Sequence, residues 1–257
     1  MTEEAPRPEE ERKEEGGTRE PRDAAYWARY AETLKVSDVP EGAAGINVEG
    51  RRAVGPLQGF GKMWQKTYRV RLGGVAVTPA EVIKTWKENY TEFWPEGNRF
   101  YAPLAGIAPG EVALISGSLP GGVKLSTGVM VLYADDESFT LMTPQGHPFS
   151  GWITFSSFEE DDATAVQAQV LMRANDPLYE MGLRMGGHKM EDEMWRQTLA
   201  NLAAHFGVHE RVETHIICVD PKLQWKEYRN VWHNAGIRSA LYSVTAPLRW
   251  RRSRGSR

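Results

Sequence analysis

The chain has 257 residues, 41% of them hydrophobic, and a formal net charge of −3 at pH 7. That length can bury a substantial core in one main domain, and the small net charge disfavours nucleic acid, whose binding requires neutralised phosphates. The single cysteine, Cys218, excludes an internal disulfide, and no apolar run is long enough to span a bilayer. Since the N-terminus also lacks the apolar core of a signal peptide, we expect a cytoplasmic protein.

The two ends of the chain carry opposite charge. Residues 1–23 hold nine acids and five bases with almost no large apolar side chain, which predicts a disordered tail. Residues 246–257 hold five arginines and no acid. Two interpretations stay open for this basic end: a frayed tail after a packed element, or a weak contact with an anionic membrane. The membrane contact would use Arg249, Trp250, Arg251 and Arg252.

A strand and a well-capped helix begin the main domain. The strand is predicted at residues 65–72, where Tyr68, Val70 and Leu72 share one face. Thr78-Pro79-Ala80-Glu81 has the pattern of a capping box with proline at the first helical position, which predicts a helix that ends before Pro95. Helical spacing predicts a core-facing stripe, some of whose aromatic rings could line a pocket. The stripe consists of Val82, Trp86, Tyr90, Phe93 and Trp94.

Short antiparallel strands are predicted after this helix, separated by polar connectors. In the last of them, Val166, Ala168, Val170 and Met172 alternate with Gln167, Gln169, Leu171 and Arg173, so the first set should face the core. The predicted strands are 112–115, 122–125, 128–133, 139–142, 152–158 and 165–172.

A long amphipathic helix follows the strands. Asp176-Pro177 predicts the start of a helical region that Gly186-Gly187 interrupts, and apolar spacing then predicts a helix over residues 189–206. Beyond it we expect a strand at 215–219 and a helix at 221–233, which Asn234-Ala235-Gly236 ends.

In this order, the elements resemble the SRPBCC superfamily, the helix-grip fold of START domains, the birch pollen allergen (Bet v 1) and polyketide cyclases. The residues that carry the resemblance are Val77-Thr78-Pro79-Ala80-Glu81-Val82 with Trp86, and Trp195-Arg196-Gln197-Thr198-Leu199 with Leu202. A narrower similarity is to an uncharacterised bacterial domain family with a Gly-His-Pro turn between two strands. That turn is here Gly146-His147-Pro148, followed by Ser150-Gly151, but Trp152-Ile153 stand where acids are expected in that family.

The resemblance implies an α+β fold, in which a curved antiparallel sheet grips a long C-terminal helix over an apolar cavity, with a C-terminal αβ extension. The expected segments are an acidic disordered tail (1–23), a lead-in segment (24–64), the helix-grip domain (65–210), the C-terminal extension (211–245) and a basic tail (246–257).

Two sequence features resemble catalytic motifs, a phosphate-binding loop and a single cysteine, but neither fits its motif. A phosphate-binding loop ending at Gly61-Lys62 would need glycine where Pro56 stands and serine or threonine where Met63 stands. Cys218 lies in an apolar run, which predicts a small buried side chain rather than a thiolate nucleophile.

Histidines provide the remaining candidates. His147 is the one candidate acid or base because imidazole titrates near neutrality, and the alternative is a turn histidine that hydrogen-bonds to backbone. His205 and His209 have the spacing of zinc ligands, but Gly207 should break the helix between them, so we assign no metal site.

The resemblance implies binding of a hydrophobic or amphipathic small molecule, such as a lipid, quinone or polyketide, without a cofactor. The alternatives are a cyclase or hydratase that uses His147 in the same cavity, and a peripheral membrane or interaction protein that uses the basic tail. We expect Trp86, Tyr90, Trp152, Met194 and Trp195 to form the apolar wall, with Gln169 and Arg173 as polar contacts.

Overall fold

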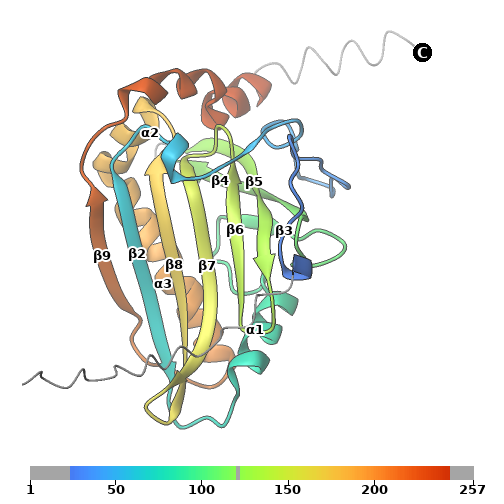
Figure 1. Ribbon diagram of the computed structural model, residues 1–257, viewed down its shortest axis with the longest axis vertical. Coiled ribbons are helices and arrows are strands. Elements are labelled where there is room, and N and C mark those ends of the chain that lie inside the picture. Colours follow the sequence, from blue (N-terminus) through green and yellow to red (C-terminus); the bar gives the residue numbers. More distant parts are fainter. Residues whose placement is uncertain (1–23, 120–121, 244–257) are drawn as a thin grey trace, which may run out of the picture.

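The computed structural model describes residues 24–119 and 122–243, so both expected charged tails lie outside the described residues. Within this part of the chain, nine strands form one sheet in the order β3-β4-β5-β6-β7-β8-β2-β9, with β1 paired to β6. The sheet curves around the long helix α3, and the C-terminal extension crosses one end of it (Figure 1). The strands are β1 (Ala53–Val54), β2 (Met63–Leu72), β3 (Arg99–Tyr101), β4 (Val112–Leu119), β5 (Val123–Ala134), β6 (Ser138–Pro144), β7 (Phe149–Glu160), β8 (Ala163–Ala174) and β9 (Glu213–Asp220).

The helices of the described residues lie before, between and after these strands. The α-helices are α1 (Pro79–Glu88), α2 (Pro177–Gly182) and α3 (His188–His205), and a π-helical turn, η3 (Leu183–Gly187), joins the last two. The 3₁₀ helices are η1 (Ala24–Tyr26), η2 (Pro56–Gln58) and η4 (Trp225–His233), and residues 235–243 form a last helix. No helix in the described ranges is long and apolar enough to cross a bilayer.

Helix α1 begins where the sequence predicts and ends earlier. The amide of Glu81 donates to Thr78 Oγ1 at 3.3 Å and the amide of Thr78 donates to Glu81 Oε2 at 2.9 Å, which confirms the capping box. The helix ends at Glu88, because Asn89 closes it with two hydrogen bonds to the carbonyl of Thr85. Phe93 is nevertheless buried, so the predicted stripe is right about packing and wrong about the length of the helix.

One predicted break in the sheet is wrong. The segments 122–125 and 128–133 belong to a single strand, β5, which pairs with β4 from Val112 opposite Met130 to Leu119 opposite Val123. A Cβ atom on Gly128 would lie 2.2 Å from the carbonyl oxygen of Ala113, so this glycine permits a close approach of two strands. Strand β3 was not predicted, because it has only three residues.

Helix α3 packs on the concave side of the sheet, as the helix-grip resemblance implies. Asp176 caps α2 by accepting from the amides of Leu178 and Tyr179 at 2.9 and 3.1 Å, and Gly186, with φ 117°, kinks the chain before α3. Leu199 of α3 and Ala168 of β8 meet in the main core. The alternation predicted for β8 is confirmed, because its predicted inner residues are all buried: Val166, Ala168, Val170 and Met172.

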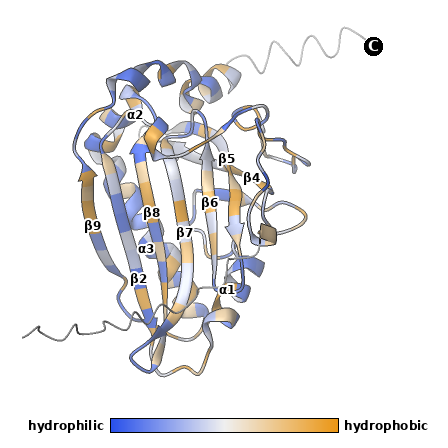
Figure 2. Cartoon of the chain, in the orientation of Figure 1, coloured by the Kyte–Doolittle hydropathy of each residue, from blue (hydrophilic) through white to orange (hydrophobic). Residues whose placement is uncertain are grey.

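The C-terminal extension contains two corrections to the sequence prediction. Asn234 ends η4, as predicted, since its amide donates to the carbonyl of Val231 at 3.2 Å. It also begins a helix at residues 235–243 that was not predicted, since its Oδ1 accepts from the amide of Ile237 at 3.0 Å. Strand β9 pairs with β2 at one edge of the sheet and is strongly hydrophobic in Figure 2. Cys218 on this strand is half-buried rather than buried, because an edge strand has one uncovered side.

Candidate ligand cavity

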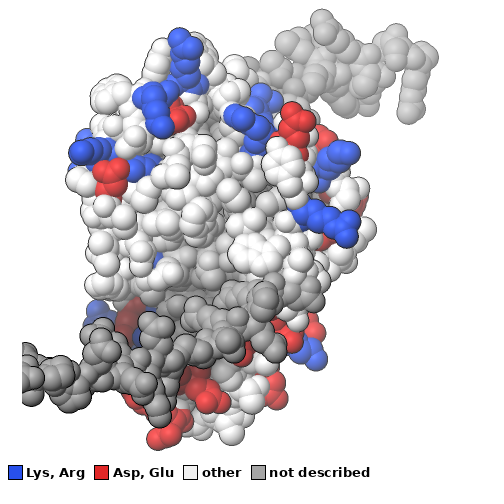
Figure 3. All heavy atoms as spheres, viewed as in Figure 1, with Lys and Arg blue, Asp and Glu red and all other residues white. Residues whose placement is uncertain are grey.

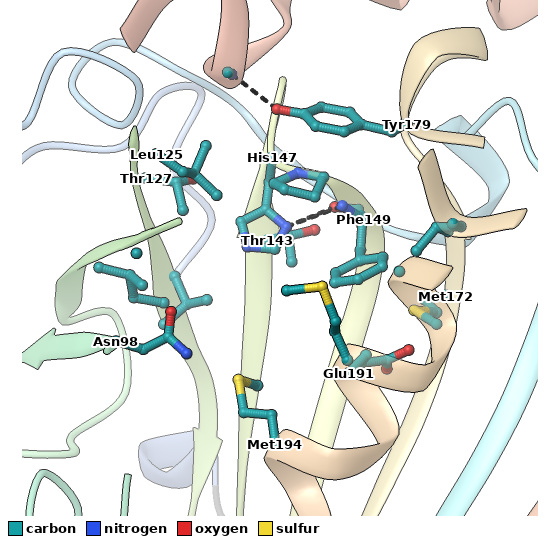
Figure 4. Close-up of a pocket in the computed structure, with 18 of the residues that line it drawn as sticks. Asn98, Leu125, Thr127, Thr143, His147, Phe149, Met172, Tyr179, Glu191 and Met194 are labelled. Carbon is teal, nitrogen blue, oxygen red and sulfur yellow. Dashed lines mark hydrogen bonds between the residues drawn. The ribbon is translucent and has the colours of Figure 1, made fainter. Parts of the chain in front are cut away.

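A cavity of about 600 Å³ lies between the concave face of the sheet, the start of α3 and the extension (Figure 4). Ligand pockets for small molecules commonly have this size. Side chains two residues apart along a strand lie on the same face of the sheet. Each of these strands therefore contributes one or two apolar residues to the cavity. The apolar lining includes Ile115 of β4, Leu125 and Val129 of β5, Leu141 of β6, Ile153 of β7, Val170 and Met172 of β8, and Met194 and Trp195 of α3.

The C-terminal extension closes one end of this cavity. Gly236, Ile237 and Ala240 line it together with Tyr179 of α2. The amide of Gly236 donates to Tyr179 Oη at 2.8 Å, so the two segments meet directly over the cavity (Figure 4). The sequence prediction missed this wall, because it placed no helix at residues 235–243, directly after Asn234.

His147 lies in the turn between β6 and β7 and faces the cavity beside Thr143 and Phe149 (Figure 4). The amide of Phe149 lies 3.0 Å from His147 Nδ1. The carbonyl oxygen of Phe149 lies 3.1 Å from the same nitrogen, so Nδ1 accepts from the amide when the imidazole proton is on Nε2 and donates to the carbonyl when the proton is on Nδ1. Burial lowers the pKa of His147 to about 4, so the ring is neutral at physiological pH.

We expect the imidazole of His147 to stay uncharged from pH 8 down to pH 5, because burial moves its pKa from 6.5 to about 4. A folded pKa below the unfolded one means that this residue stabilises the fold above pH 6.5 and loses that contribution as the pH falls through about 4. NMR titration of the Cε1–H resonance, assigned with His147→Gln, measures the midpoint. A midpoint above 6 would contradict this expectation.

A buried ionic cluster supports the wall at the first turn of α3. Lys66 Nζ lies 2.6 Å from Glu191 Oε2 and 2.6 Å from Asp192 Oδ1, and the Lys66 side chain is only 1% exposed. Tyr68 donates to the same oxygen of Asp192 at 2.6 Å. Burial raises the pKa of Glu191 to about 7, although Lys66 acts in the opposite direction. Sequence reasoning missed the cluster, yet one signal was present: Lys66 shares the predicted core face with Tyr68, Val70 and Leu72.

Four of the expected ligand contacts border the cavity: Tyr90, Trp152, Met194 and Trp195. The indole ring of Trp152 points away from the cavity, to the other side of the sheet. There it packs on Gly55, where an added Cβ would lie 3.2 Å from the Cζ3 atom of Trp152. Period-two alternation explains this, since Gly151 and Ile153 face the cavity.

The other three expected contacts do not border the cavity, which corrects their placement. Trp86 is completely buried below it, against Phe155 at 4.8 Å between ring centroids. Gln169 and Arg173 alternate with the cavity-lining Val170 and Met172 and therefore point to the outer face. There Gln169 donates to Thr67 Oγ1 at 3.3 Å, and Arg173 donates to the carbonyl of Gly61 at 2.6 Å.

No group of three or more His, Cys, Asp or Glu side chains in the described ranges could hold a metal ion. His205 ends α3 and packs edge-on against Phe93, with ring centroids 5.5 Å apart. His209 lies beyond that helix, after Gly207, whose φ of 77° turns the chain.

Fold and cavity together describe a helix-grip protein with a partly open, mainly apolar cavity. No protein-family model and no curated protein matches the sequence. Among the solved structures with a similar fold is one described as a START superfamily protein.

Three of these structures show the extent of the similarity. A START superfamily protein from Mycobacterium smegmatis is 18% identical, with 57% of this chain and 98% of that chain covered and a TM-score of 0.39. The chain is also similar to Ara h 8.0201, at 12% identity over 55% of this chain and 97% of that chain, with a TM-score of 0.39. The di-domain ARO/CYC protein StfQ from the steffimycin biosynthetic pathway is 9% identical, with 57% and 53% coverage and a TM-score of 0.44. At these identities the similarity concerns the fold alone.

Proposed function

We propose that this protein binds a hydrophobic or amphipathic small molecule, such as a lipid, a quinone or a polyketide-like compound, in the cavity between the sheet and α3. The observation that carries the proposal is the cavity itself, about 600 Å³ with a mainly apolar lining. Protein interiors are normally packed to crystal density, with few voids larger than a water molecule. A volume of this size is therefore a feature of the fold that a ligand would fill.

The composition of the lining supports an apolar occupant. Aliphatic and aromatic side chains from five strands and α3 leave few polar atoms to hold water, and apolar cavities bind apolar molecules in preference to water. Filling the cavity would restore the dispersion contacts that its walls lack. Thr143 and His147 are among the few polar groups that could orient the occupant.

A substitution that fills the cavity should abolish binding. Met194 lines the cavity from α3, so Met194→Trp should weaken binding of the neutral fluorescent probe N-phenyl-1-naphthylamine at least tenfold by occupying its volume. Met185→Trp makes the same change at a side chain that is 77% exposed and should leave the affinity unchanged. Probe fluorescence and native mass spectrometry measure binding and any retained ligand. Equal binding by both variants, or no binding by the unchanged protein, would reject the proposal.

A cyclase or hydratase in the same cavity is a second proposal, supported by the position of His147 at the cavity wall. With Nδ1 accepting from the amide of Phe149, Nε2–H can donate a hydrogen bond to a substrate carbonyl. With Nδ1–H donating to the carbonyl of Phe149, Nε2 is free to accept a proton as a general base.

The peripheral-membrane alternative depends on Arg249, Trp250, Arg251 and Arg252, which lie outside the described residues. The adjacent described segment offers some support. Trp225 and Trp232 are 68% and 78% exposed, and Figure 3 shows basic side chains gathered at this end of the molecule. Exposed aromatic rings beside basic groups suit an anionic lipid surface, so membrane contact stays a third proposal.

A further inference from the structure

The buried cluster at the cavity wall has one positive group for two negative ones. Lys66 contacts both Glu191 and Asp192, and the side chains of Lys66 and Glu191 are 1% and 4% exposed. An excess negative charge out of water is unfavourable unless a proton or another donor compensates it. Two other titratable groups of α3 lie nearby. Burial followed by the charge of Lys66 lowers the pKa of His188 to about 4, so it supplies no compensating charge. Arg196 interacts electrostatically with Asp192 and not with Glu191, so the positive charge that it adds acts on the acid that does not line the cavity.

Only one of the two acidic residues lines the cavity. Glu191 lines it, whereas Asp192 does not. Among the described residues that line the cavity, Glu191 is the only acid, and none is a lysine or an arginine. A molecule inside the cavity is therefore bordered by one acidic residue and by no lysine or arginine.

This charge pattern selects the polar end of an amphipathic ligand. A hydroxyl or a protonated amine could donate to a Glu191 oxygen in addition to the bond from Lys66, because a carboxylate oxygen accepts more than one hydrogen bond. A ligand carboxylate would instead face a like charge in surroundings of low dielectric constant, where repulsion is strong. The neutral polar residues elsewhere on the wall include Asn98, Ser118, Thr127, Thr143, His147, Tyr179 and Asn234.

We propose that Glu191 is the polar anchor of the cavity, and that the ligand is an amphipathic molecule which places a hydroxyl or an amine, not a carboxylate, against the first turn of α3. This inference rests on the proposed function, since it requires that the cavity binds a ligand. It narrows the occupant to alcohols and amines with an apolar body, and it excludes free fatty acids.

Four probes with the same ten-carbon chain test the anchor: decylamine, 1-decanol, decyl methyl ether and decanoic acid. Each displaces N-phenyl-1-naphthylamine from the unchanged protein at pH 8, where the amine and the acid are both charged. We expect decylamine and 1-decanol to displace the probe at concentrations at least tenfold lower than the ether or the acid. Equal displacement by all four would overturn the anchor while leaving the proposed function intact, whereas failure of the naphthylamine itself to bind would overturn the proposed function.

Two matched amide variants locate the effect. Glu191→Gln should reduce the preference for decylamine over the ether at least tenfold and should improve binding of decanoic acid, because the wall loses its negative charge. Asp192→Asn removes the charge of the other carboxylate that contacts Lys66 and does not change the cavity lining. This variant should keep the original order of the probes. An equal change in both variants would assign the effect to the cluster as a whole and overturn the role of Glu191. Circular dichroism shows whether each variant is folded. If a variant does not fold, the probe series on the unchanged protein still tests the proposal.

Discussion

Replacement of Lys66 by methionine is expected to lower the free energy of unfolding by about 3–5 kcal/mol, because removing one partner of a buried ion pair leaves the other charge uncompensated. Lys66 is 1% exposed and lies 2.6 Å from both Glu191 Oε2 and Asp192 Oδ1, so two carboxylates lose their counter-ion at once. Methionine keeps the length and the apolar stem of the side chain, which limits the loss of packing. Urea unfolding at pH 7 measures the change.

The pH dependence gives this prediction a second readout. Burial already places the pKa of Glu191 near 7, and without Lys66 it should rise further. An acid whose folded pKa is raised stabilises the fold below its unfolded pKa and loses that contribution as the pH rises through the folded one. The variant should therefore lose more stability at pH 8 than at pH 5, relative to the unchanged protein.

Two controls separate the charge from the substitution. Lys84→Met makes the same change at an exposed position of α1 and should alter the free energy of unfolding by less than about 0.5 kcal/mol. Adding Glu191→Gln and Asp192→Asn to Lys66→Met removes all three charges and should recover most of the loss. A loss no larger than that of Lys84→Met would show that the cluster does not contribute to stability.

The cluster also shows how far the sequence could predict this site. Alternation along β2 puts Lys66 on the same face as Tyr68 and Val70, so its burial was readable from a local pattern. Its partner Glu191 lies 125 positions further on, and no local pattern pairs the two. Capping boxes and periodicity depend on neighbours within one or two turns, which is why α1 and β8 were predicted and the cluster was not.

The sequence prediction of the cavity-lining residues differs from the structure for two reasons. Gln169 and Arg173 were expected to contact a ligand although the same alternation placed them opposite Val170 and Met172, so the period-two pattern already contained the correct answer. The part of the cavity wall that the C-terminal extension forms could not be predicted from such a local pattern. Asn234 both ends η4 and begins the helix at residues 235–243, and its side chain is held by a contact from Nδ2 to Asp176 Oδ2, at 2.9 Å and 58 positions away in the sequence.

The extension closes the cavity through a contact that tolerates no side chain. Gly146, in the turn between β6 and β7, accepts a hydrogen bond from the amide of Ala235 at 2.9 Å. A Cβ atom on Gly146 would lie 2.0 Å from the carbonyl oxygen of His233. Asn47 holds the same segment from the lead-in side, with Nδ2 3.2 Å from the carbonyl of Ala235 and 3.0 Å from Ser239 Oγ.

Gly146→Ala should therefore displace the C-terminal extension from the cavity. Its φ of 92° alone should cost about 1 kcal/mol, and the clash with His233 should bring the loss in free energy of unfolding to about 2–4 kcal/mol. Gly50→Ala is the matched control, because its φ of 70° carries the same backbone penalty with nothing within 4 Å of the added Cβ. Hydrogen exchange should become faster in residues 234–243, and N-phenyl-1-naphthylamine should dissociate faster, only in the Gly146 variant. If both variants behave alike, the contact with His233 does not hold the cavity closed.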